Sequence, residues 1–302
     1  PEMSRGLGDV YKRQLSYLQE AKRAGMKITP LLHNDFDLQE TKKLLHDSGA
    51  VQNLARQITA TALVYDFDGW NSDFENMDEA DKFLYTKFIK TVSEKLHMHG
   101  KEISVDITVN SNSPNWSLCY DRKGMAAYVD YEVIMGYDQT PGGSRYSGPV
   151  SSYSWLKHHI AMLLKQVPNN KLVLGLPFYT RIWTGKEGQA ASSVLMMKQI
   201  KSLLGQNNIG LFWNPEDRQY VGIWEENGQT RKVWFEERRS LQESFSLAHD
   251  YKLAGLAFWR YGFETEDIYN QIEGAFLNKK DESVRYKNRS CLLYTSDAAD
   301  DL

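Results

Sequence analysis

The chain has 302 residues, of which 41% are hydrophobic, 12% aromatic and 25% charged, and its formal net charge is -3. This is the composition of a globular protein with a large core, so disorder is excluded for the bulk of the chain. The near-neutral charge, without a run of five like charges, gives no reason to expect a nucleic-acid partner. No apolar stretch approaches the roughly 18 residues that a membrane span needs.

Both ends of the chain are similar to translated sequencing adapter. Ser4 to Gln14 is the translation of one strand of a common transposase adapter, and Cys291 to Asp300 is the translation of its opposite strand. We therefore treat residues 1–14 and 291–302 as adapter artefact and expect the natural segment to be a fragment of a longer gene. A signal peptide is then not observable in this sequence.

Short aliphatic runs alternate with segments of helical period along the chain, which predicts repeated βα units on a parallel sheet. The predicted strands are residues 27–33, 64–74, 102–109, 131–137, 171–178 and 254–261. The predicted helices are residues 15–25, 37–63 with a break near Gly49, 78–98, 122–128, 153–166, 240–250 and 266–277. Six strands fit an α/β fold of the (β/α)8 TIM-barrel type that is truncated at its N-terminus, although a doubly wound sheet has the same pattern.

Residues 182–239 interrupt this rhythm. Alternating aromatic and polar residues flank Glu226-Asn227-Gly228, and an Asn-Gly pair in that setting predicts a β-hairpin. We expect a small α+β insertion before the last strand. The barrel then comprises residues 15–181 and 240–277, and residues 278–290 form a tail or linker.

The stretch from Val64 to Glu75 carries the chemistry. Side chains alternate along a strand, so Asn71, Asp73 and Glu75 share one face while Trp70, Ser72 and Phe74 share the other. Neighbouring carboxylates in a partly desolvated site repel, and one of them then holds a proton near neutral pH. A carboxylic acid of that kind can protonate the leaving oxygen of a glycosidic bond. A solvated strand end is the structural alternative.

The motif Asp68-Gly69-x-Asn71-x-Asp73-x-Glu75 resembles the Asp-Gly-x-Asp-x-Asp-x-Glu signature of glycoside hydrolase family 18, with Asn71 in place of the middle Asp. That replacement, followed by Asp73-Phe74-Glu75-Asn76, resembles the branch of spore-cortex and cell-wall lytic N-acetylglucosaminidases. Three later segments resemble family strand ends in the same order: Met135 to Asp138, Leu174 to Arg181 and Gly255 to Trp259.

This resemblance implies a retaining mechanism in which the acetamido group of the substrate is the nucleophile. Glu75 is then the acid and base, Asp73 orients the acetamido group and Tyr137 donates to its carbonyl oxygen. Asp68 and Asn71 are expected behind Asp73, where they tune its charge. The implied substrate-binding residues are Met135, Asp138, Tyr179, Arg181 and Trp259, with Trp259 as the floor under the sugar. Trp116 and Trp183 are further candidates for the edge of the cleft.

The expected substrate is a glycan polymer or oligosaccharide that contains β-1,4-linked N-acetylglucosamine. Asn71, and Phe74 in place of a Trp common in chitinases, favour peptidoglycan over chitin. We expect no cofactor, no metal, no nucleic acid and no membrane span, and we expect a monomer in an extracellular or cell-wall location. The alternatives are a non-catalytic carbohydrate-binding protein of the same fold and, with least support, a barrel enzyme that uses a divalent metal.

Overall fold

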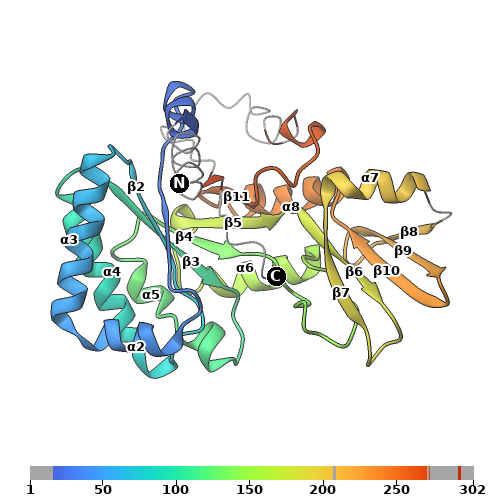
Figure 1. Ribbon diagram of the computed structural model, residues 1–302, viewed down its shortest axis with the longest axis horizontal. Helices are drawn as coiled ribbons and strands as arrows, with labels where there is room; N and C mark the ends of the chain where they lie inside the picture. Colours follow the sequence, from blue (N-terminus) through green and yellow to red (C-terminus); the bar gives the residue numbers. More distant parts are fainter. Residues whose placement is uncertain (1–15, 207–208, 271, 273–291, 294–302) are drawn as a thin grey trace, which may run out of the picture. The chain divides into compact units, whose positions relative to one another are not determined.

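The computed structural model describes residues 16–206, 209–270, 272 and 292–293 (Figure 1). These residues form two compact units. Unit 1 comprises the chain up to Asp106 together with Ser111–Glu132, and unit 2 comprises Ile107–Asn110 and the chain from Val133 onward. No helix in the described ranges is both long enough and apolar enough to cross a bilayer.

Unit 1 is built on three parallel strands in the order β1 (Leu31–His33), β2 (Gly69–Asp73) and β3 (Glu102–Thr108). Its main helices are α2 (Leu38–His46), α3 (Ser48–Val64) and α4 (Lys82–His97), and the short helix α5 (Arg122–Met125) follows β3. Figure 1 shows α3 and α4 running beside β2 and β3. Residues 16–23 are helical, as predicted.

The predicted break in the first long helix is present at Asp47, two residues before Gly49. The Asp47 carboxylate accepts hydrogen bonds from the Gly49 and Ala50 amides and so caps α3 at its N-terminus. The predicted start of the next strand is wrong, because α3 runs to Val64. Asp66 then takes a left-handed conformation with φ of 52°, and the strand begins only at Gly69.

The two faces of β2 are those that the sequence predicts. On the outward face the Trp70 indole donates to the carbonyl of Ile58 at 3.1 Å, and the Ser72 hydroxyl bonds the hydroxyl of the buried Tyr85 at 3.0 Å. The Phe74 ring stacks on Tyr85 with ring centroids 5.5 Å apart. This face is therefore fixed against α3 and α4, which leaves Asn71 and Asp73 on the opposite face.

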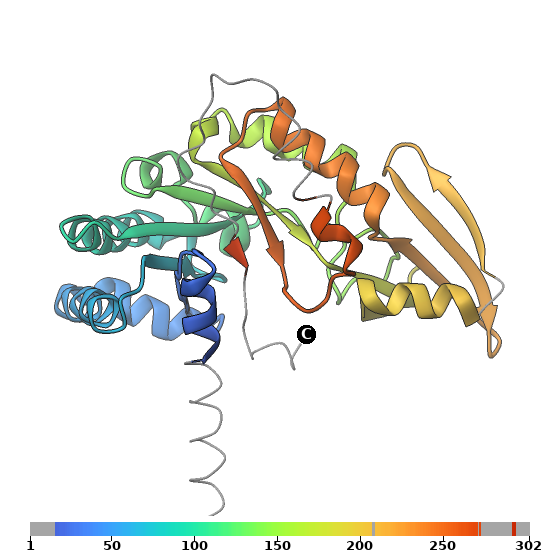
Figure 2. The same cartoon turned by 90° about the horizontal axis from the view of Figure 1, so that it is seen from above.

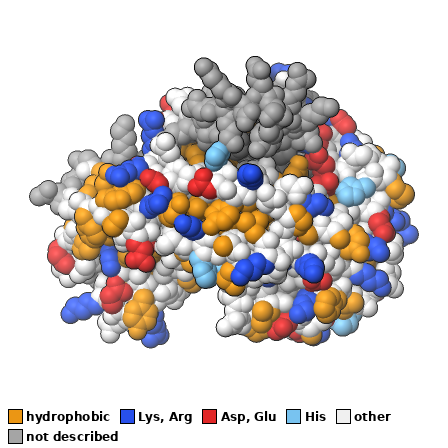
Figure 3. All heavy atoms as spheres, turned by 180° about the vertical axis from the view of Figure 1, so that it is seen from behind, with side chains coloured by type: hydrophobic (Ala, Val, Ile, Leu, Met, Phe, Trp, Pro, Cys, Tyr) orange, Lys and Arg blue, Asp and Glu red, His pale blue; other side chains and the backbone are white. Residues whose placement is uncertain are grey.

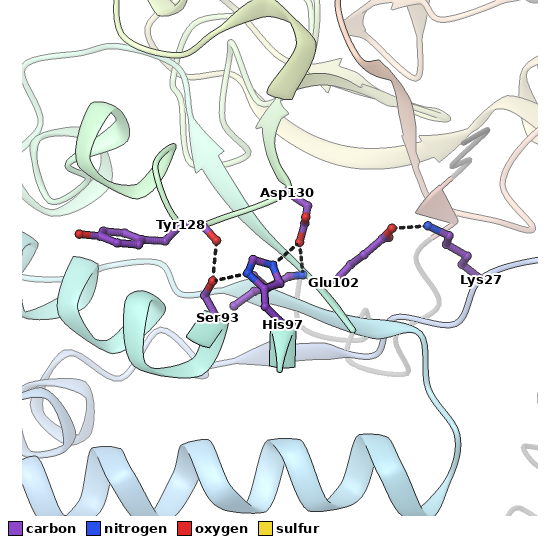
Figure 4. A network of polar contacts seen from close by, with 7 residues as sticks. Lys27, Ser93, His97, Glu102, Tyr128 and Asp130 are labelled. Carbon is purple, nitrogen blue, oxygen red and sulfur yellow. Dashed lines mark hydrogen bonds and ion pairs between the residues drawn. The ribbon is translucent and has the colours of Figure 1, made fainter. Parts of the chain in front are cut away.

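A network of polar contacts lies at the N-terminal end of β3 and joins it to the segment before β1 (Figure 4). Asp130 accepts from the Ile103 amide at 2.8 Å and contacts His97 at 3.0 Å, and Lys27 pairs with Glu102 at the start of β3. The Ser93–His97–Asp130 order resembles that of a hydrolytic triad. However, Ser93 is buried and its hydroxyl donates to the carbonyl of Tyr128 at 2.6 Å. We therefore assign this hydroxyl a structural role and not that of a nucleophile.

Unit 2 carries three further parallel strands in the order β4 (Tyr131–Met135), β5 (Leu172–Pro177) and β11 (Gly255–Trp259). The helices α6 (Tyr153–Leu163) and α8 (Arg238–Asp250) connect them. The two-residue strand β12 (Leu292–Leu293) pairs in parallel with the far edge of β11. With β1, β2 and β3, these strands account for all six predicted ones.

A second sheet of unit 2 is antiparallel and has the strand order β7-β6-β10-β9-β8. Its strands are β6 (Tyr179–Thr184), β7 (Ala191–Met196), β8 (Gly210–Asn214), β9 (Gln219–Glu226) and β10 (Gln229–Phe235). Helix α7 (Met197–Gln206) follows β7 (Figure 2).

The predicted Asn-Gly hairpin joins β9 to β10. Asn227 and Gly228 both have positive φ, at 53° and 74°, as a tight turn of this kind requires. The sheet also includes Tyr179–Thr184, so it starts three residues before the boundary predicted at 182. Of the predicted closing helix, residues 267–270 and 272 are helical and the remainder lies outside the described residues.

Candidate active site

Asn71 is the centre of a buried polar cluster on the inward face of unit 1. Its side-chain amide donates to the Ser104 hydroxyl and to a carboxylate oxygen of Asp106, both at 2.9 Å. Ser104 is the register partner of Asn71 on β3, and Asp106 lies two residues further along the same face. All three side chains are buried.

Asp73 is the last residue of β2 and pairs in register with His33 of β1. Burial raises the pKa of the Asp73 carboxyl to about 6, and the nearby His33 charge opposes part of that rise. Its Oδ1 atom is buried and has no hydrogen-bond partner within the described part of the chain. Asp73 is therefore a largely desolvated carboxyl group that exchanges a proton near neutral pH.

Glu75 lies two residues beyond the end of β2, and side chains from other segments hold its backbone. The Asn34 side chain accepts from the Glu75 amide at 3.0 Å and donates to the Glu75 carbonyl at 2.7 Å. The hydroxyl of the buried Tyr120 donates to the carbonyl of Phe74 at 2.8 Å. The residue predicted to be the catalytic acid is thus anchored at a defined place beside the strand end.

Two exposed aromatic rings lie next to this strand end. Phe36 and Trp116 have 52% and 42% of their surface exposed, and their ring centroids are 5.9 Å apart. The Asn76 side chain donates to the carbonyl of Phe36 at 2.9 Å, which ties the pair to the residue after Glu75. Exposed ring faces can cover the C–H face of a sugar ring.

A second group of predicted site residues is brought together in unit 2. One carboxylate oxygen of Asp138 accepts from the Tyr179 hydroxyl at 3.0 Å and from the buried Arg181 guanidinium at 3.3 Å. The Tyr137 ring meets the Tyr179 ring edge to face, with centroids 6.3 Å apart. Tyr137 and Asp138 follow Gly136, just beyond the end of β4, which is the strand end that the sequence predicts for them.

The remaining predicted residues of unit 2 occupy different environments. Met135 is the buried last residue of β4, and Trp259 is the half-buried last residue of β11. Trp183 is fully buried with Ala190, Val221 and Trp234, and its indole donates to the carbonyl of Gly148 at 2.8 Å. Trp183 is therefore a core residue of the second sheet, and its proposed place at the edge of the cleft is wrong.

The expectation that Asp68 lies behind Asp73 is also wrong. The Asp68 carboxylate accepts from the Ile28 amide at 2.8 Å, at the start of β2. Five residues of extended chain separate it from Asp73, which is about 16 Å at the usual rise of a strand. Asp68 therefore ties β2 to the preceding segment, and Asp106 is the carboxylate beside Asn71.

Four residues of this site were absent from the sequence prediction: Asn34, Ser104, Asp106 and Tyr120. Asn34 directly follows the predicted strand 27–33, and Ser104 and Asp106 share one face of the predicted strand 102–109. Their polar side chains, at the ends or on one face of the strands next to β2, are the feature of the sequence that could have identified them as site residues. Within the described ranges, no cluster of three or more His, Cys, Asp or Glu side chains could hold a metal ion.

Comparison with known proteins identifies the family. The model of the family described as "Glycosyl hydrolases family 18" matches residues 11–264, which is most of the chain. The chain therefore belongs to glycosyl hydrolase family 18, a family of enzymes that act on glycans. The resemblance of the Asp68 to Glu75 motif to this family is confirmed.

Two relatives from Bacillus subtilis illustrate the relationship. The chain is 26% identical over 276 residues to "Uncharacterized glycosylase YvbX", which covers 88% of this chain and 79% of the relative. It is 26% identical over 267 residues to a "Cortical fragment-lytic enzyme", which covers 83% of this chain and 61% of that protein. The chain thus spans less than two thirds of the cortical enzyme.

Solved structures support the same fold. The chain superposes on the spore cortex-lytic enzyme SleL of Bacillus megaterium with a TM-score of 0.78 and 22% identity, covering 85% of this chain and 61% of that one. It superposes on a chitinase of Chromobacterium violaceum with a TM-score of 0.79 and 20% identity, covering 86% and 83%. Together with the family, these similarities give a TIM-barrel-like α/β fold with a parallel sheet.

Proposed function

We propose that the chain hydrolyses β-1,4 bonds of N-acetylglucosamine-containing polymers with retention of configuration, and that peptidoglycan is the preferred polymer over chitin. The observation that carries this proposal is the state of Asp73, whose buried carboxyl has a pKa raised to about 6 and a free acceptor oxygen two residues before Glu75. An amide N–H of the substrate is the kind of donor that this oxygen lacks.

The proposed reaction has two steps. Glu75 gives its proton to the glycosidic oxygen while the acetamido carbonyl oxygen attacks the anomeric carbon, and the bond to the leaving sugar breaks. The charged Asp73 stabilises the positive charge that develops on the acetamido nitrogen. The Glu75 carboxylate then takes a proton from water, whose oxygen attacks the same carbon and reopens the ring. The family resemblance assigns Tyr137 the donation of a hydrogen bond to the acetamido carbonyl.

The cortical fragment-lytic relative and the Asn71 replacement support peptidoglycan. A cell-wall polymer as substrate would place the protein outside the cytoplasm, and we propose that location on this ground. The surface shown in Figure 3 has positive and negative side chains interspersed, which suits a glycan better than a polyanion.

The test compares the wild-type protein with Glu75→Gln and with the control Glu94→Gln, an exposed carboxylate on the helix α4. Each is incubated with purified peptidoglycan and with chitin oligomers, and NMR follows the anomeric configuration of the first product. We expect the β-anomer from the wild type and the control, and loss of hydrolysis but not of binding in Glu75→Gln. Equal glycan binding by all three without any hydrolysis would instead support the carbohydrate-binding alternative.

A further inference from the structure

The backbone of Glu75 lies outside the strand ladder of unit 1. The register of β2 with β1 ends at Asp73, and that with β3 ends at Ser72. Among the described residues, Glu75 thus lies beyond the part of β2 that pairs with β1 or β3. Contacts other than strand pairing must hold this residue, because a general acid must stay within hydrogen-bonding reach of the atom it protonates.

The Asn34 side chain makes such contacts with the backbone of Glu75. Its Oδ1 accepts from the Glu75 amide and its Nδ2 donates to the Glu75 carbonyl, so both polar groups of one residue are held by a single side chain. The remaining proton of Nδ2 is directed to the Thr41 hydroxyl at 2.8 Å. Thr41 is buried and donates in turn to the carbonyl of Asp37 at 2.6 Å.

These contacts fix the orientation of the Asn34 amide. Thr41 Oγ1 gives its proton to Asp37 and is left to accept, so the group facing it must be the NH2 end of Asn34. The carbonyl end of Asn34 is then the one that faces the Glu75 amide. A carboxylate at position 34 could accept from that amide but could not donate to the Glu75 carbonyl.

We propose that Asn34 is a positioning residue that sets the place of the Glu75 carboxyl group for proton transfer. This inference rests on the proposed role of Glu75 as acid and base. The Phe74 carbonyl is held separately by Tyr120, so loss of Asn34 removes two backbone hydrogen bonds of Glu75 while the anchor of the preceding residue is kept. Displacement of about 1 Å is enough to reduce the rate of a reaction strongly.

The test uses Asn34→Ala and Asn34→Asp, with Asn169→Ala as the matched control. The Asn169 side chain donates to the carbonyl of Lys252 at 3.1 Å, so its loss removes the same kind of backbone anchor at a site in unit 2 that is unrelated to Glu75. We expect both Asn34 variants to lower kcat by about ten- to a hundredfold with KM changed less than about twofold. The basic limb of the pH–rate profile is expected to move in these variants only.

A second readout does not depend on activity. Hydrogen exchange at the Glu75 amide is expected to be faster in Asn34→Ala than in the wild type, and unchanged in Asn169→Ala. Variants that keep the wild-type kcat and pH profile while exchange at Glu75 accelerates would overturn the positioning role. If the wild type hydrolyses none of the glycans but the exchange result is as expected, the proposed function fails and the anchoring of Glu75 by Asn34 stands.

Discussion

His33 and Asp73 are register partners at the ends of the parallel strands β1 and β2, so their side chains leave the sheet on the same face. The charge of a protonated His33 favours the ionised form of Asp73, whereas burial opposes it more strongly and raises the pKa to about 6. His33 also contacts the exposed Asp35 at 3.0 Å. The histidine is thus placed to moderate the proton affinity of the buried carboxyl.

Replacing His33 with Gln is expected to raise the pKa of Asp73 above its value of about 6, because the opposing positive charge is removed. The carboxyl resonance of Asp73, followed by NMR as the pH is varied, measures this directly. The control is His97→Gln, which removes a histidine bound to Asp130 at the other end of the strands. An unchanged titration of Asp73 in His33→Gln would show that the two groups do not interact.

Asp73→Asn is expected to stabilise the protein at pH 7 while it abolishes hydrolysis. The folded-state pKa of about 6 lies above the ordinary value of 3.8, so the folded state binds more protons between these pH values and stability falls as the pH rises through that window. A difference of about two pKa units corresponds to about 3 kcal/mol at neutral pH. Thermal unfolding at pH 7 and pH 4 measures it.

The gain in stability in Asp73→Asn is expected to shrink toward pH 4, where Asp73 of the folded wild type is protonated and the cost of a buried charge is removed. A gain of equal size at both pH values would show that the gain does not come from removing the buried charge of Asp73. A less stable variant at pH 7 would contradict the expected gain itself.

The sequence predicts the alternation of strands and helices because the signals for each element lie within that element. The βα alternation, the two faces of β2 and the Asn227-Gly228 turn each depend on residues within one element or one turn. The start of β2 was predicted too early because Val64 is β-branched, which favours a strand, whereas in the structure it continues the helix α3. Propensity over two or three residues does not reveal that a helix continues.

The contacts within the site depend on register, which a single sequence does not display. Asn71 meets Asp106 across 35 positions, and Asn34 meets Glu75 across 41. The motif from Asp68 to Glu75 identifies the strand that bears the carboxylates, but only the pairing of β1, β2 and β3 shows which neighbours complete the site. The motif also suggested that Asp68 lies behind Asp73, whereas its carboxylate accepts from the Ile28 amide at the start of β2.

Asn71→Asp restores the residue that the family signature has at this position, yet it is expected to destabilise this protein. The Asn71 amide donates to Asp106 at 2.9 Å, and a carboxylate there would face a second carboxylate in a buried place. We expect a loss of about 1–3 kcal/mol at pH 7, by urea unfolding. The double variant Asn71→Asp with Asp106→Asn exchanges the two groups and is expected to recover most of the loss.

Trp116→Ala tests whether the exposed aromatic pair contributes to glycan binding. A ring that stacks on a sugar contributes about 0.5–1.5 kcal/mol beyond the burial of its area, so dissociation constants for glycan oligomers should rise about two- to tenfold. The matched control is Phe83→Ala on α4, because Phe83 is 64% exposed and the Lys82 ammonium lies over its ring. Calorimetry with the Glu75→Gln protein separates binding from turnover.

The Phe36 and Trp116 rings lie 5.9 Å apart, and Asn76 bonds the Phe36 backbone. An effect of Trp116→Ala without one of Phe83→Ala would therefore place a bound sugar next to the catalytic strand end. Equal affinities in both variants would assign the Phe36–Trp116 pair to packing alone.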